Sequence, residues 1–176
     1  MKKIVLVVVC VILLAVLAFA VYMGVFSTVA IVEEDQGPYT LVYREMSGND
    51  LKQVGDITLA LNTLLGERGI PHRKPLDIFF PDGRAEIGFA VEGVSAAQIA
   101  GLSDQAKVRE IPAQRCMVAR FPWRNTLSFI VGYLKVDPAL TNYRGAHGYP
   151  KVEAYSLDDG ETIVYMQPVR RGPDRQ

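Results

Sequence analysis

A long uncharged segment at the amino terminus constrains the fold of this chain more than any other feature. From Ile4 to Val32 the sequence carries no charged residue, and most positions are aliphatic or aromatic. A bilayer core about 30 Å thick takes about 20 apolar residues of helix, and Ile4 to Phe26 meets that length. We therefore predict a transmembrane anchor at residues 1–27, a globular domain at 28–169 and a frayed tail at 170–176.

A cleaved signal peptide is the alternative for this segment. Ala18-Phe19-Ala20 has the small-x-small spacing of a cleavage site. The apolar run nevertheless continues from Val21 to Phe26, where the mature chain after a cleaved signal turns polar. This continuation favours an uncleaved anchor.

The charges on the two sides of the segment predict its orientation. Lys2 and Lys3 precede it, whereas Glu33, Glu34 and Asp35 follow it. By the positive-inside rule, we expect a cytoplasmic amino terminus and an extracytoplasmic carboxy-terminal domain in a single-pass membrane protein.

Charge and cysteine content limit the classes of partner. The chain has 19 Lys and Arg residues against 19 Asp and Glu residues, whereas a protein that binds nucleic acid normally has a basic excess. Cys10 lies in the apolar segment and Cys116 in the domain, so the two do not pair. The charge balance therefore predicts no nucleic-acid partner. Because the sequence has no CxxC motif and no Cys/His cluster, it predicts no metal site, and we expect no cofactor.

Two halves of the domain show the same order of secondary-structure signals. β-Branched runs, helical spacing of Ile57, Leu61, Leu64 and Leu65, and Gly/Pro turns predict these elements in the first half. The expected elements are strands at 28–32, 40–44, 76–80 and 86–91, a helix that starts at Asp50 or Asp56 and ends at Gly66 or Gly69, and a short helix at 95–100. In the second half we expect strands at 106–111, 115–121, 151–156 and 162–168, an irregular segment at 122–136, and a helix from Asp137-Pro138 to Gly145 or Gly148.

An offset of 75 residues relates the two halves. Five identities occur at that offset, which alone is close to chance: Leu59/Leu134, Leu65/Leu140, His72/His147, Pro75/Pro150 and Glu86/Glu161. The recurring order of elements is the stronger argument. We predict an α+β fold made of a tandem β-α-β-β repeat with pseudo-two-fold symmetry, and a ligand cleft at the seam between the halves.

Several short motifs, in their order and spacing, resemble the GyrI-like small-molecule-binding domain, also called the bacterial effector-binding domain, in its membrane-anchored subgroup. The resemblance covers Val29 to Val169. It is carried by Gly37-Pro38-Tyr39, Asp77-Ile78-Phe79-Phe80, Arg109-Glu110-Ile111-Pro112-Ala113, Phe121-Pro122-Trp123 with Asn125-Thr126-Leu127-Ser128, Val136-Asp137-Pro138-Ala139-Leu140 and Pro150-Lys151-Val152-Glu153-Ala154-Tyr155.

Two departures from the family pattern limit what the resemblance implies. Phe79-Phe80 stands where the family often has a pair of tyrosines, so hydroxyl contacts from that side are missing. The apolar segment also occupies the place of a helix-turn-helix, which disfavours a transcription regulator. The autophagy-receptor function of some anchored members does not transfer either, because it depends on a long tail with a binding motif.

Glu153 is the principal candidate for a ligand-binding residue. Strand alternation places Glu153 and Tyr155 on one face, and Val152 and Ala154 on the other. The resemblance implies that this glutamate faces the cleft and binds cationic aromatic compounds. The alternative is that Glu153 is a solvated strand residue beside Lys151 without a binding role.

Aromatic residues supply the candidate walls of the cleft. Tyr155, Trp123, Phe80 and Tyr43 are the predicted ligand-binding residues beside Glu153, with Tyr133 and Tyr165 as further members of the aromatic set, and core packing is the competing explanation for each. His72 and His147 lie in Gly/Pro-containing loops without a third ligand, so we predict neither a metal site nor a catalytic residue.

The sequence thus predicts an anchored domain that binds small amphipathic or cationic molecules without chemistry, for sensing or sequestration. Two alternatives remain open. One is a hydrolase of small electrophilic compounds in which Glu153 acts as general base. The other is a protein-interaction adaptor at the membrane, whose cleft is filled by side chains.

Overall fold

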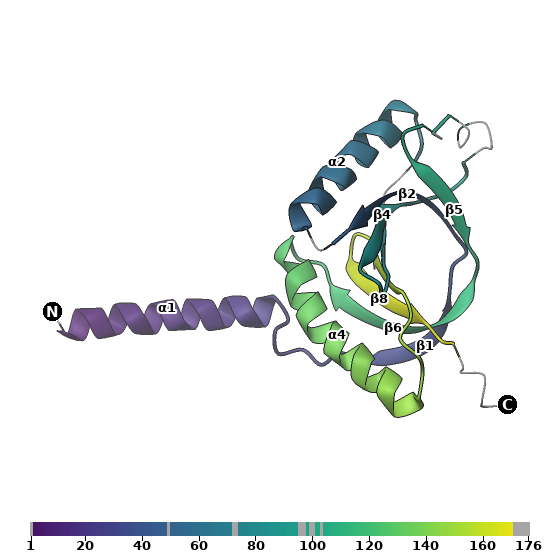
Figure 1. The fold of residues 1–176 in the computed structure, drawn as a ribbon. Helices are drawn as coiled ribbons and strands as arrows, with labels where there is room; N and C mark the ends of the chain where they lie inside the picture. Colours follow the sequence, from purple (N-terminus) through teal and green to yellow (C-terminus); the bar gives the residue numbers. More distant parts are fainter. Residues whose placement is uncertain are drawn as a thin grey trace.

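The structure is a computed structural model, and it describes residues 2–48, 50–71, 74–94, 98, 101–102 and 104–170. Within these residues, three helices and eight strands follow one another along the chain (Figure 1). Their bounds are α1 Lys2–Tyr22, β1 Ile31–Gln36, β2 Tyr39–Ser47, α2 Leu51–Glu67, β3 Lys74–Phe79, β4 Arg84–Val91, β5 Lys107–Ile111, β6 Gln114–Pro122, α4 Leu127–His147, β7 Ala154–Asp158 and β8 Thr162–Pro168.

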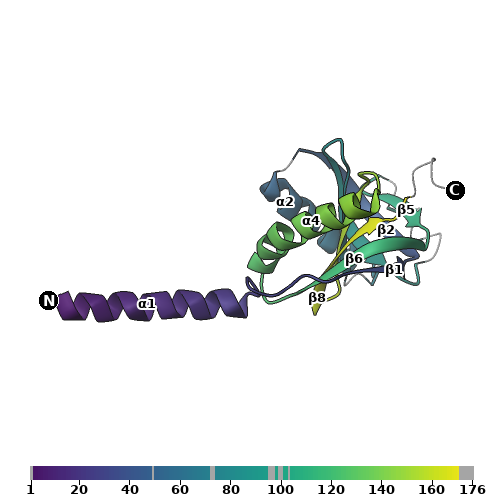
Figure 2. The same cartoon turned by 90° about the horizontal axis from the view of Figure 1, so that it is seen from below.

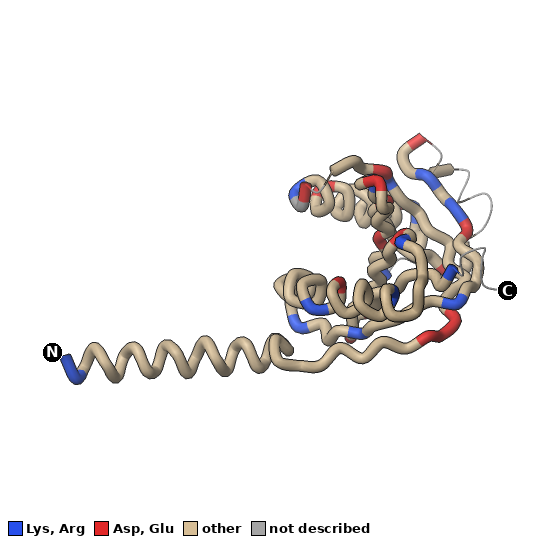
Figure 3. Tube along the Cα trace, turned by 60° about the horizontal axis from the view of Figure 1, so that its bottom comes forward, with Lys and Arg blue, Asp and Glu red and all other residues tan. Residues whose placement is uncertain are grey.

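The apolar segment forms a single helix, α1, that projects from the domain (Figure 1). Its 21 residues give a length of roughly 30 Å, enough to cross a bilayer. None of the described residues of α1 is buried against the domain. Figure 3 shows that acidic and basic residues are missing along α1 beyond its first residues.

All eight strands form one antiparallel sheet in the order β1-β6-β8-β7-β3-β4-β2-β5. Each half contributes three central strands, β2, β4 and β3 from the first and β6, β8 and β7 from the second. The halves meet where β3 pairs with β7. The predicted α+β fold with a tandem β-α-β-β repeat is confirmed.

The edge strands are exchanged between the halves. β1 comes directly before β2 in the chain but pairs with β6, and β5 comes directly before β6 but pairs with β2. β2 spans Tyr39–Ser47 and β6 spans Gln114–Pro122, so the two correspond residue for residue at the offset of 75. The offset found in the sequence is therefore the structural repeat.

This exchange forces the sheet to curve strongly. Gln36 ends the first strand in the order and Tyr39 starts the seventh, yet three residues of chain reach only about 10 Å. In a flat sheet, six strand spacings would separate them by about 29 Å. The β1–β2 connection and the β5–β6 connection also lie in contact, because a Cβ on Gly37 (φ 92°) would lie 3.2 Å from the Pro112 carbonyl oxygen. The sheet consequently curls around its inner face.

Both domain helices cover the outer face of the sheet (Figure 2). Two outer clusters of buried residues form there, one under α2 with Leu61 and Leu65, and one under α4 with Val136 and Leu140. A third cluster lines the inner face, which carries neither α2 nor α4. It consists of Leu41, Tyr43, Leu76, Ile78, Ala90, Ile111, Cys116, Val118, Tyr155, Leu157, Val164 and Met166.

Helix α2 forms as its sequence pattern predicts. Asp50 caps it by accepting a hydrogen bond from the Lys52 N–H (2.9 Å). Ile57, Leu61 and Leu64 are buried at helical spacing. The predicted short helix at 95–100 falls largely outside the described residues, and His72 also lies outside them.

The prediction of an irregular segment at 122–136 is wrong, because α4 already begins at Leu127 and contains Pro138 in its interior. Its buried face is Ser128, Gly132, Val136 and Leu140, every fourth residue. The first two of these are small, so the apolar period was not visible in the sequence. The start is fixed by Ser128 Oγ, which accepts from Arg124 N–H (3.0 Å), and by Asn125 Oδ1, which accepts from Leu127 N–H (2.9 Å).

Most strand bounds shift from the prediction, and the shifts of β1 and β7 affect charged residues. β1 runs to Gln36 rather than ending at Val32, since the charged residues of this edge strand find partners: Glu33 accepts from Tyr149 Oη (2.9 Å) and Glu34 pairs with Arg120. β7 begins at Ala154 instead of residue 151, which leaves Glu153 immediately before the strand.

Candidate ligand site on the inner face of the sheet

Glu153 lies on the inner face of the curved sheet. It shares that face with Tyr155, whose hydroxyl donates to Glu153 Oε1 (3.4 Å) and whose ring belongs to the inner cluster. The Glu153 side chain is only 12% exposed. A carboxylate so removed from water needs a cation or donors to offset the lost hydration.

Arg170 supplies that cation. It follows the last strand, β8, and its Nη2 donates to Glu153 Oε1 at 2.6 Å. The arginine side chain is itself 59% exposed. Glu153 is therefore held by a counter-ion that reaches it from the water side of the site.

Two groups beside Glu153, the Tyr155 hydroxyl and the Cys116 thiol, have raised pKa values. Burial, reinforced by the Glu153 charge, raises the pKa of the Tyr155 hydroxyl, which is partly offset by a hydrogen bond with Gln114. Burial raises the pKa of the Cys116 thiol to about 11, with Asp35 and Glu153 adding to the effect. Both groups thus stay neutral beside the carboxylate.

A second carboxylate, Glu86, lies in the same row of the inner face. β-Sheet register places Tyr155 beside Ile78, and Ile78 beside Glu86, so Glu86 stands two strand spacings, about 10 Å, from Tyr155. The Glu86 side chain is 7% exposed, and its Oε1 accepts from Arg109 Nη1 (3.0 Å). Its Oε2 is buried and accepts no hydrogen bond from the described residues.

Burial raises the pKa of Glu86, and the Arg109 guanidinium partly offsets the rise. Tyr43, another predicted wall residue, is buried in the inner cluster, and its pKa is raised by burial and by the Glu86 charge. Glu86 was not among the predicted site residues, since the predicted strand at 86–91 reads as an apolar run in which Glu86 is the single charge, at its start.

The remaining predicted residues divide between two places. Phe80 packs against the inner cluster, with the Arg84 guanidinium 4.9 Å from its ring centre. Trp123 is not brought to this face: it forms an edge-to-face contact with Phe129 of α4, 5.0 Å between ring centres. The structure thus groups Glu153, Tyr155, Tyr43 and Phe80 and places Trp123 near the start of α4.

The other aromatic and histidine candidates lie outside the inner face. Tyr165 packs in the cluster under α4, where its hydroxyl donates to the Phe129 carbonyl (3.3 Å) and burial raises its pKa. Tyr133 is exposed on α4. His147 stacks on Tyr143, 4.0 Å between ring centres. Among the described residues, no three His, Cys, Asp or Glu side chains gather as metal ligands.

Asp77 is a carboxyl with a perturbed pKa that was not among the predicted site residues. It lies on β3 with its register partner Ser156 on β7, at the seam of the two halves. Burial raises its pKa to about 7, partly offset by the hydrogen bond that the Gly88 N–H donates to Asp77 Oδ1 (3.2 Å). The group thus titrates near neutral pH.

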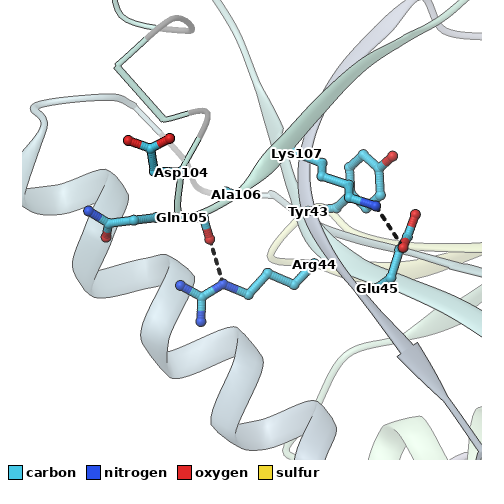
Figure 4. A pocket seen from close by; sticks show the side chains of 7 residues that line it. All are labelled: Tyr43, Arg44, Glu45, Asp104, Gln105, Ala106 and Lys107. Carbon is cyan, nitrogen blue, oxygen red and sulfur yellow. Dashed lines mark hydrogen bonds and ion pairs between the residues drawn. The ribbon is translucent and has the colours of Figure 1, made fainter.

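A shallow pocket of about 390 Å³ lies at the edge of the sheet, where β2 extends beyond the start of β5 (Figure 4). Its polar walls largely pair with each other: Arg44 Nε donates to the Gln105 carbonyl (2.8 Å), and Lys107 pairs with Glu45 (2.7 Å). Its lining residues are Tyr43, Arg44, Glu45, Asp104, Gln105, Ala106 and Lys107. Glu153 is not among them.

Comparisons with known proteins reveal the fold. Neither the search of protein-family models nor that of curated proteins finds a match. Among solved structures, the EcmrR C-terminal domain superposes with a TM-score of 0.59 at 11% identity, over 82% of this chain and 99% of that domain. The chain shares the fold of that domain.

Two further structures share this fold. SAV2435 bound to tetraphenylphosphonium superposes with a TM-score of 0.51 at 15% identity, over 80% of this chain and 94% of that one. EcmrR in its complex with DNA superposes with a TM-score of 0.61 at 9% identity, over 91% of this chain and 65% of that one. At these identities the likeness extends to the fold alone.

Proposed function

We propose that this chain is a membrane-anchored domain that binds small lipophilic cations on the inner face of its sheet, for sensing or sequestration. The observation that carries the proposal is Glu153, a carboxylate 12% exposed among aromatic and apolar side chains. A lipophilic cation would offset the charge of this carboxylate and stack on Tyr155 or Phe80. That a protein of this fold binds tetraphenylphosphonium supports the choice of ligand class.

The ion pair with Arg170 suggests how a ligand enters. Because the arginine is 59% exposed, its guanidinium can move into water without crossing the protein interior. An organic cation would then take over its contact with Glu153. The Arg170 position marks the side of the site from which a ligand approaches.

Binding of tetraphenylphosphonium to the full chain in detergent tests the proposal. Glu153→Gln keeps the shape of the side chain and removes its charge, so we expect affinity to fall about tenfold or more. Glu161→Gln, an exposed glutamate in the β7–β8 hairpin, is the matched control and should leave affinity unchanged. Neutral triphenylphosphine oxide should bind both variants alike. Equal tetraphenylphosphonium affinity of wild type and Glu153→Gln would refute the proposal.

We also propose that α1 spans the membrane with its amino terminus in the cytoplasm. Support comes from the length of α1, its exposed apolar surface and the lysines before it. Alkaline phosphatase fused after Gln176 should be active in a bacterial host, because this enzyme matures only outside the cytoplasm. An inactive fusion with normal expression would show that the domain lies in the cytoplasm, and it would refute the proposed orientation.

A further inference from the structure

The exposed apolar side chains of the domain are concentrated at one place. Beyond residue 27, the large apolar side chains exposed in the described chain are Val32, Leu59, Phe79, Leu127, Ile130, Tyr133 and Leu134. Four of these seven lie in the first two turns of α4. The other three are scattered over β1, α2 and β3.

These four residues form a stripe on the outward face of α4. Leu127, Ile130 and Leu134 follow helical spacing, and Tyr133 flanks them. The same face continues at helical spacing through Asp137 and Thr141, which are polar and exposed. The apolar stripe therefore covers only the amino-terminal part of α4. Its opposite face, with Gly132 and Val136, packs on the sheet.

The stripe lies beside the end of α1. Figures 1 and 2 both place the first turns of α4 next to the carboxy-terminal end of α1. Tyr22 at the end of α1, and Val25 and Phe26 just after it, expose further apolar side chains. The apolar surface of α1 thus continues onto the domain.

Contacts fix the end of α1 against the domain. Lys135 Nζ of α4 donates to the Gly24 carbonyl (3.2 Å), the Val25 carbonyl (2.5 Å) and the Ser27 carbonyl. Met23 is buried, and its sulfur accepts from Asn125 Nδ2 (3.5 Å). The segment after α1 is therefore docked rather than a free linker, so the direction of α1 determines which face of the domain meets the bilayer.

The flanking groups match a membrane interface. The Arg124 guanidinium lies 5.6 Å from the centre of the Tyr22 ring, and Tyr133 borders the stripe. Tyrosine rings are enriched at the headgroup level, and arginines there reach lipid phosphates. An apolar stripe bordered by such groups has the composition of a helix that lies in the interfacial plane.

We propose that the first two turns of α4 lie in the surface of the same bilayer that α1 spans. Leu127, Ile130, Tyr133 and Leu134 would be immersed roughly 5–10 Å into the boundary between headgroups and acyl chains. This rests on the proposed membrane anchoring by α1. The domain then sits directly on the membrane with a fixed orientation.

Fluorescence quenching in vesicles tests this placement. The full chain with Cys10→Ser and Leu134→Cys, labelled with the environment-sensitive fluorophore NBD, is reconstituted in phosphatidylcholine–phosphatidylglycerol vesicles with brominated acyl chains. Cys116 is buried, and burial raises its pKa to about 11, so it stays unlabelled. The matched control carries the label at Thr141→Cys, on the same face further along α4. We expect about twofold stronger quenching at position 134 than at 141.

Two further measurements separate the possible failures. Alkaline carbonate extraction reports on anchoring: release of the chain refutes the membrane-anchored function, and with it this inference. If the chain stays anchored but positions 134 and 141 are quenched equally, only the inference is overturned. Oxidative cross-linking of unlabelled Leu134→Cys between copies, together with weak quenching at 134, would show that a second copy covers the stripe and would also overturn it. Because Leu134 is exposed, the substitution leaves the core intact.

Discussion

The guanidinium of Arg170 lies 2.6 Å from the Glu153 carboxylate, although these residues belong to different ends of the last hairpin. The glutamate is nearly buried at the start of β7, whereas the arginine follows β8 and remains largely in water. The charge of a nearly buried acid is thus balanced by a cation that can readily return to water. If the inner face binds organic cations, Arg170 is their intramolecular competitor.

Removal of this competitor should strengthen ligand binding. In Arg170→Gln, a lipophilic cation no longer has to displace a charged hydrogen bond, so we expect tetraphenylphosphonium to bind about three- to tenfold more tightly. Equilibrium dialysis of the full chain in detergent measures this. The double variant Arg170→Gln with Glu153→Gln should lose the gain. Unchanged or weaker binding by Arg170→Gln alone would contradict the competition.

Asp77 should make stability depend on pH. Its pKa is raised from 3.8 in the unfolded chain to about 7 in the folded one, so between these values the folded state binds more protons than the unfolded state. The free energy of unfolding should therefore be highest below about pH 4, fall as the pH rises to 7, and then level off. Asp77→Asn keeps an acceptor for the Gly88 N–H and should remove this slope, with a gain of up to about 3 kcal/mol at pH 8.

Urea unfolding at pH 4.5, 6 and 8 measures this dependence. The matched control is Asp82→Asn in the exposed β3–β4 turn. An Asp77→Asn variant that keeps the wild-type slope would assign the pH dependence to another group.

The Glu86–Arg109 pair should respond unequally to single and double substitutions. Arg109→Met leaves the carboxylate of Glu86 buried without its cation, so we expect a loss of about 3 kcal/mol in the free energy of unfolding. The double variant Glu86→Leu with Arg109→Met removes both charges and should recover most of the loss. Denaturant unfolding of the four members of this cycle gives the coupling. Additive losses would mean that the pair does not interact.

Gly132 should be required for the close approach of α4 to the sheet. A Cβ there would lie 2.6 Å from the Tyr165 hydroxyl and 3.1 Å from the Phe121 ring. Gly132→Ala should therefore destabilise the fold by about 1–3 kcal/mol. Gly145→Ala, on the same helix, would place its Cβ more than 4 Å from every described atom outside its own stretch of helix, and it should instead stabilise the fold by about 0.5–1 kcal/mol. Thermal unfolding of both variants measures these changes. Equal shifts in Tm would contradict the explanation by close packing at Gly132.

The sequence predicted the repeat, its offset and the buried face of α2, because each depends on the order and spacing of local patterns. It also predicted that Glu153 and Tyr155 share a face, since strand alternation carries over to the residue before β7. It failed at α4, where Ser128 and Gly132 occupy buried positions that large apolar residues usually mark. Close packing against Phe121 and Tyr165 requires a residue without a side chain at Gly132, whereas Ser128 accepts the hydrogen bond from the Arg124 N–H that helps to start the helix. Neither requirement is visible in the apolar spacing of the sequence.

The candidate site was less accessible to prediction. Trp123 was predicted to line the cleft at the start of an irregular segment, but its neighbour Phe129 belongs to α4, which the sequence did not place correctly. Arg170 was assigned to a frayed tail, and its contact with Glu153 depends on how β8 ends next to β7. Glu86 pairs with Arg109 of β5, and β5 lies beside β2 in the first half only because the edge strands are exchanged.

The exchange of edge strands also governs the order in which this protein can be completed during synthesis. β1 is the first strand to leave the ribosome, yet its neighbour in the described sheet, β6, is made about eighty residues later. Until then, the exposed edge of β1 and the open edge of β2 could pair with other chains. Because β1 follows α1 so closely, insertion of α1 into a membrane during translation would hold this unfinished edge at the lipid surface, away from other nascent chains in solution.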